Sequence, residues 1–242
     1  MKFSVEKGLL ILLWLITGMF AVPGRADQIP LILSDSLEPQ RKELEEAVLS
    51  AQMIIRDFAK RHGWEELTKQ SFADRAEIYD KKEMFDRRLL ELAGVPLDTR
   101  LPKEYSAALE KRVLVAVSPQ LYAQNYPDGI EKKSFEKLLA HEIAHRLHIR
   151  ILNGNEEAMG PIWFFEGFAI YAAEQFEKSS PDLNPKEMWE IVKSPNRGSY
   201  KKYATVFRHF LKKATLQELV KHAGKKDFLN WLEKIDIVNK NV

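Results

Sequence analysis

The chain has 242 residues, no cysteine, and 37 basic against 35 acidic side chains, which gives a formal charge of +2 at pH 7. Without cysteine there can be no disulfide and no lipid attached through a thiol. The balanced charge argues against a nucleic-acid partner, which a basic excess or stripe would indicate. The length fits one large globular domain, and the sequence leaves the oligomeric state open.

The N-terminus predicts an export signal. Lys2 and Lys7 come before an almost wholly apolar run at 8–22, and small residues follow this run. This order is typical of a secretory signal peptide, and the run is short for a membrane span, which needs about 20 residues. We therefore expect residues 1–26 to be a signal peptide and residues 27–242 to be periplasmic or secreted, away from the membrane. An uncleaved membrane anchor is the alternative.

Apolar periodicity and the capping and breaking residues predict an α+β fold. Helical spacing with Gly or Pro at the ends indicates helices, and β-branched apolar runs indicate strands. In chain order, we expect a helix over 36–63, a weak strand over 73–79, a helix over 82–93, a strand over 112–118, and helices over 134–152, about 161–176, 185–193, 199–213, 215–222 and 226–235. The C-terminal half is therefore mainly helical.

Two of the predicted helices carry residues with the spacing of a metal site. In the sequence His141-Glu142-Ile143-Ala144-His145, the two histidines lie one helical turn apart on one face, at about 100° per residue. Two imidazoles so placed can bind one Zn²⁺. Glu142 then lies beside the metal, where a carboxylate can take a proton from a zinc-bound water. A catalytic zinc needs three protein ligands and an open position, and Glu166 is the candidate third ligand.

These motifs resemble those of the gluzincins, the thermolysin-like zinc metallopeptidases of the peptidase MA clan. In that family H-E-x-x-H is followed by a ligand glutamate on a later helix. The stretch from Trp163 to Ala169 is similar to the W-x-x-E-G-x-A form of a bacterial branch. The resemblance covers about residues 72–232 and implies a gluzincin-like core of a small sheet and two motif helices. It further implies one bound Zn²⁺ and a general base. By this resemblance, His141, His145 and Glu166 would be the zinc ligands and Glu142 the base.

The resemblance also implies a substrate-binding strand and a donor to the oxyanion. Val113–Val117 is the candidate for an edge strand that pairs with extended peptide; an ordinary buried strand is an equal alternative. For the donor, Tyr200 and Tyr203 are the candidates, with Tyr200 favoured and His209 third. In thermolysin, an aspartate four residues after the ligand glutamate orients a ligand histidine. This chain has Ile170 at that position, so the hydrogen-bond partner of the ligand histidine is unassigned.

One further histidine lies on the same helix face. His148 is two turns from His141, about 10 Å along the helix axis. That separation predicts a hydrogen-bonded histidine at the edge of the cleft and not a metal ligand.

We therefore expect an exported zinc metallopeptidase that hydrolyses a peptide or protein substrate, with a zinc-bound water activated by Glu142. The alternative is a non-catalytic exported domain that keeps zinc and binds peptides or acts as a scaffold. Structural zinc sites are usually closed by four Cys or His ligands, so two histidines, one glutamate and a neighbouring acid favour the enzyme. An aminopeptidase is disfavoured because no G-x-M-E-N stretch precedes His141.

Overall fold

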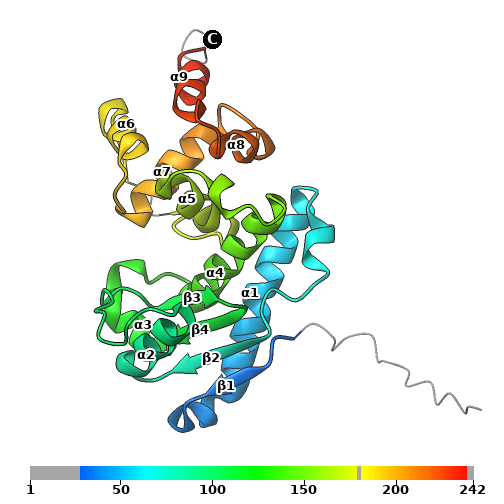
Figure 1. Ribbon diagram of the computed structural model, residues 1–242, viewed down its shortest axis with the longest axis vertical. Coiled ribbons are helices and arrows are strands. Elements are labelled where there is room, and N and C mark those ends of the chain that lie inside the picture. The colour runs from blue at the N-terminus through cyan, green and yellow to red at the C-terminus, as the bar shows by residue number, and fades with distance from the viewer. Residues whose placement is uncertain (1–27, 179–180, 239–242) are drawn as a thin grey trace, which may run out of the picture.

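The computed structural model describes residues 28–178 and 181–238, which form an α+β fold as the sequence predicts (Figure 1). The predicted signal peptide, residues 1–26, lies outside the described residues. Among the helices of 28–178 and 181–238, none combines the length and apolarity that a membrane crossing requires. The sheet lies at one end of the molecule, and the C-terminal helices lie at the other.

The sheet has four strands in the order β1-β2-β4-β3. β1 (Leu31–Leu33), β2 (Arg75–Tyr79) and β4 (Val113–Val117) run parallel, and β3 (Ala107–Glu110) runs antiparallel to β4. Every residue of β4 is buried, as expected for an interior strand covered on both faces. Of the two alternatives for Val113–Val117, the ordinary buried strand is therefore confirmed and the edge strand is wrong, because β3 lies between this strand and the edge.

A series of four packed helices connects the sheet to the C-terminal half. α1 (Arg41–Arg61) packs along α4 (Ser134–Ile151), α4 packs against α5 (Ile162–Ala172), and α5 packs against α7 (Tyr200–Leu211). α4 also reaches β3, so it stands between the sheet and the helical half (Figure 1). α5 is apolar on nearly every side, which suits a helix that is enclosed all round.

The remaining helices complete the two ends of the molecule. Asn184 and Thr215 each form a capping box with a glutamate three residues on, which defines the starts of α6 and α8. The helices and short 3-10 helices not yet given are α2 (Lys82–Ala93), α3 (Pro119–Asn125), α6 (Pro185–Lys193), α8 (Leu216–Ala223), α9 (Phe228–Val238), η1 (Asp35–Gln40), η2 (Glu65–Thr68), η3 (Pro127–Gly129) and η4 (Glu156–Met159).

The two largest shifts of predicted helix boundaries are at the start of α1 and the end of α5. The helix expected from residue 36 begins as α1 at Arg41, because residues 35–40 form a 3-10 helix with Pro39 inside it. The helix expected to reach about residue 176 ends at Ala172, because Glu174 adopts a left-handed backbone conformation at φ 57°. The second shift matters for the site, since the chain after α5 turns back toward α4.

Candidate metal centre

α4 and α5 bring the predicted ligands together. His141 and His145 lie on the side of α4 that faces α5, and Glu166 lies on α5 with only 2% of its surface exposed. The glycine that follows Glu166 has a packing role. A Cβ on Gly167 would meet Cβ of Phe207, on α7, at 2.8 Å. Glycine at this position therefore allows α7 to pack directly beside the ligand-bearing turn of α5.

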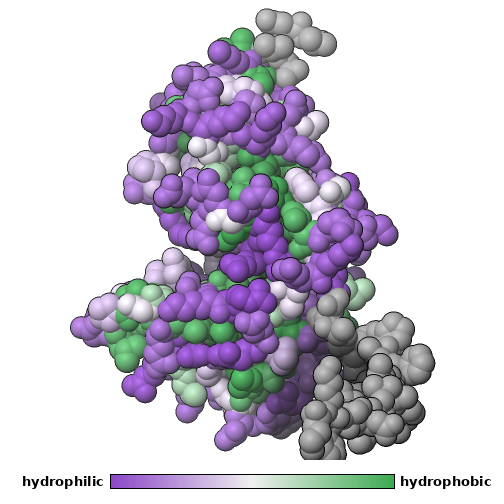
Figure 2. Space-filling view, turned by 45° about the vertical axis from the view of Figure 1, so that its right-hand side comes forward, coloured by the Kyte–Doolittle hydropathy of each residue, from purple (hydrophilic) through white to green (hydrophobic). Residues whose placement is uncertain are grey.

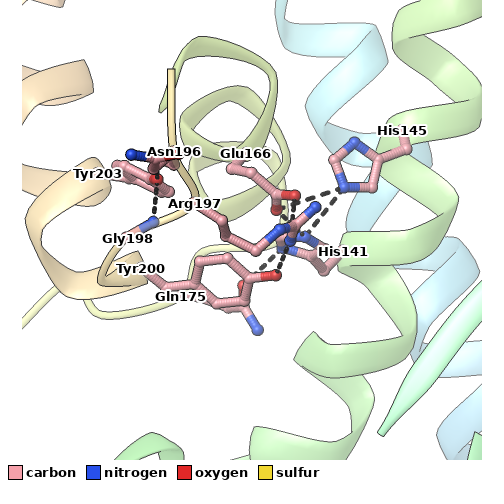
Figure 3. A network of polar contacts seen from close by, with 9 residues as sticks. All are labelled: His141, His145, Glu166, Gln175, Asn196, Arg197, Gly198, Tyr200 and Tyr203. Carbon is pink, nitrogen blue, oxygen red and sulfur yellow. Dashed lines mark hydrogen bonds and ion pairs between the residues drawn. The ribbon is translucent and has the colours of Figure 1, made fainter. Parts of the chain in front are cut away.

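The three side chains converge on one point (Figure 3). Nε2 of His141 lies 3.1 Å from Nε2 of His145 and 3.1 Å from Oε2 of Glu166, and the distance from Oε2 to Nε2 of His145 is 3.7 Å. Ligand atoms bound to a tetrahedral zinc at 2.0–2.1 Å are separated by about 3.3 Å. The observed distances bracket that value. Within residues 28–178 and 181–238, this is the one group of three or more such side chains able to hold a metal ion.

The electrostatics of the cluster also suit a cation. Burial alone would raise the pKa of Glu166, but the adjacent imidazoles of His141 and His145 hold it well below its usual range, so the carboxylate is ionised at neutral pH. Its other oxygen, Oε1, lies 2.7 Å from Nη1 of Arg197. Two imidazole nitrogens and a carboxylate oxygen this close repel one another unless a proton or a cation lies among them. The donor set therefore fits a metal ion.

The cluster lies in a cleft of about 470 Å³ between the sheet and the C-terminal helices, where Figure 2 shows the molecule hollowed at its waist. Glu142 lines the cleft but does not belong to the ligand group. Burial raises the pKa of Glu142 above the ordinary carboxyl value, which makes it a stronger base than an exposed glutamate. The opposite wall includes Ala107 and Ala108 of the edge strand β3.

The structure separates the two candidate tyrosines. Tyr200 lines the cleft, its ring stacks on His141 at 5.7 Å between centroids, and its hydroxyl accepts a hydrogen bond of 2.6 Å from Arg197. Burial raises the pKa of Tyr200, so its hydroxyl keeps the proton needed to donate into the cleft. The Tyr203 hydroxyl instead accepts from the backbone N–H of Gly198 and contacts the loop before α7. His209 pairs with Asp236 at 2.7 Å and does not line the cleft.

His148 is placed differently from the prediction. It is fully buried and its ring stacks on Phe168 at 4.3 Å. Neither ring nitrogen has a hydrogen-bond partner among the described residues, and burial lowers its pKa to about 3. His148 is therefore a neutral part of the interface between α4 and α5, and the expectation of a hydrogen-bonded histidine at the cleft edge is wrong.

Two polar residues of the site are absent from the sequence prediction. Arg197 comes from the loop before α7, and Gln175 comes from the turn after α5, where its Oε1 lies 2.9 Å from Nδ1 of His141. Both belong to irregular segments without periodicity or a recognisable motif. The one signal for Gln175 is its place just after the helix that carries Glu166, and the one signal for Arg197 is its closeness to Tyr200. Neither signal distinguishes the residue from other polar loop residues.

Comparisons with protein-family models, with curated proteins and with solved structures give no match for this chain. The α+β fold and a cluster able to hold a metal ion are thus established from the structure alone. The resemblance to gluzincins rests on the two sequence motifs.

Proposed function

We propose that the chain is an exported zinc metallopeptidase with a gluzincin-like core. The observation that carries this proposal is the convergence of His141, His145 and Glu166 on one point in a cleft, with Glu142 beside them and outside the ligand set. Two imidazoles and one carboxylate are a donor set found in catalytic zinc sites, which leave one position open. When bound, zinc would supply Lewis acidity toward water and a peptide carbonyl.

The residues of the chain divide the remaining work. Glu142 takes the proton of the attacking water and later gives it to the leaving amine; its raised pKa suits both transfers. Tyr200 donates its O–H to the developing oxyanion. Because its oxygen accepts from the Arg197 guanidinium, the hydroxyl is polarised and becomes a stronger donor.

The substrate would bind as an extended strand. In the part of the chain that the structure describes, β3 pairs with β4 alone, so its other edge is available for pairing with a further strand. Ala107 and Ala108 of β3 line the cleft, and their short side chains leave room for a peptide backbone to approach. Such β-augmentation provides affinity without many specific side chains.

The proposal is tested with purified protein, a mixed peptide library and the variant Glu142→Gln. We expect the wild type to cleave peptides and Glu142→Gln to keep the metal and the fold but lose nearly all cleavage, because an amide cannot accept the proton. Glu157→Gln, an exposed position on η4 outside the cleft lining, is the matched control and should cleave as wild type does. A metal-loaded wild type that cleaves nothing would support the non-catalytic alternative.

A further inference from the structure

The turn that follows α5 places one buried amide against a ligand histidine. Nδ1 of His141 and Oε1 of Gln175 are 2.9 Å apart, and the two residues are 3% and 5% exposed (Figure 3). A carbonyl oxygen only accepts, so Nδ1 is the donor. A neutral imidazole protonated at Nδ1 carries its lone pair on Nε2, the atom that faces His145 and Glu166.

The backbone around Gln175 adopts an uncommon conformation. Its neighbours Glu174 and Phe176 have φ of 57° and 55°, in the left-handed region that side chains other than glycine seldom adopt. Such conformations persist only where the surroundings enforce them, and they cluster at functional sites. The backbone N–H of Gln175 is tied to the carbonyl of Ile170, 3.0 Å away on α5. The turn is thus folded back onto the ligand-bearing helix.

Cationic side chains hold the three carbonyl groups of this turn. Nζ of Lys137, one helical turn before His141, donates to the carbonyl of Glu174 at 2.5 Å. Arg208 of α7 donates to the carbonyls of Gln175 at 2.7 Å and Phe176 at 2.9 Å. These bonds come from α4 and α7, so two of the helices that line the cleft fix the place of the amide.

We propose that Gln175 is the positioning residue of the metal centre: its amide carbonyl sets the tautomer and the ring orientation of His141. This inference rests on the proposed metal site but not on the proposed catalysis. A neutral acceptor orients the ring without adding negative charge, so the bound cation keeps more of its charge than it would beside a carboxylate. Lys137 and Arg208 act one step further out, through the backbone of the turn.

The test measures zinc affinity by competition with a chelator in the full chain. Gln175→Leu keeps the size of the side chain but removes the acceptor, and we expect about 10–100-fold weaker zinc binding. Gln175→Glu restores an acceptor and should bind zinc within a few-fold of wild type. Gln124→Leu, the same exchange at an exposed position of α3, is the control and should leave the affinity unchanged.

A second readout does not depend on a substitution. In ¹⁵N NMR spectra of the zinc-loaded wild type, the His141 ring should carry its proton on Nδ1. Three results would overturn the inference: wild-type affinity in Gln175→Leu, equal losses in the Leu and Glu variants, or an unprotonated Nδ1. The proposed peptidase would survive each of them. A wild type that binds no zinc would overturn the inference and the proposed function together.

Discussion

Replacing Gly167 with alanine tests whether close packing of α7 on α5 shapes the site. The added methyl group would meet Cβ and Cδ2 of Phe207 at 2.8 Å and Cγ at 3.0 Å, and the Cβ atom cannot rotate away. Overpacking of this kind costs about 1–3 kcal/mol, whereas alanine in place of glycine inside a helix stabilises by about 1 kcal/mol. Because the methyl group would make three close contacts, we expect the overpacking cost to be about 2–3 kcal/mol. After the gain from alanine is subtracted, the free energy of unfolding should fall by about 1–2 kcal/mol.

Thermal unfolding of the metal-free protein measures this loss. A change of 1 kcal/mol shifts the Tm of a protein of this size by about 2–4 °C, so the Tm should fall by about 2–8 °C. In a Phe207→Ala background, which removes two of the three atoms that the methyl would meet, Gly167→Ala should cost less. A Tm that rises, or an equal cost in both backgrounds, would refute the packing argument.

Three further predictions address the donor, the sheet and export. Tyr200→Phe should lower kcat by about 10²–10³ with little change in Tm, whereas Tyr203→Phe should lower Tm and spare kcat; the reverse pattern would move the donor role to Tyr203. Burial would raise the pKa of Glu77, but its hydrogen bonds, led by that from Arg88, lower it. Glu77→Gln should therefore lower the free energy of unfolding at pH 7, and this loss should shrink as the pH falls below about 4. A loss that stays the same at every pH would contradict the prediction. Mass spectrometry of exported protein should find an N-terminus near Asp27, and recovery of intact chain in membranes would favour the anchor.

The cluster of candidate metal ligands could be predicted from the sequence because much of its geometry is local. A spacing of four residues on one helix places His141 beside His145 whatever the rest of the fold does. Glu166 depended in addition on a second helix packing against the first, which its neighbours Trp163 and Phe164, both buried, make favourable.

The rest of the site depends on tertiary structure. Gln175 reaches His141 only because α5 stops at Ala172 and the chain reverses through two left-handed residues. Nothing in the sequence forces that conformation, since neither residue is a glycine. The edge strand β3 was equally hidden: none of its residues Ala107–Glu110 is β-branched or aromatic, and only pairing with β4 makes them a strand.

Zinc content of the purified chain tests the central claim most directly. Elemental analysis should find one zinc per molecule of wild type and of His62→Ala, a histidine outside the cluster, and little in His145→Ala or Glu166→Gln. These losses are expected because a catalytic zinc is held by three protein ligands, and each variant would leave two. Zinc absent from the wild type, or equal in all four proteins, would contradict the account.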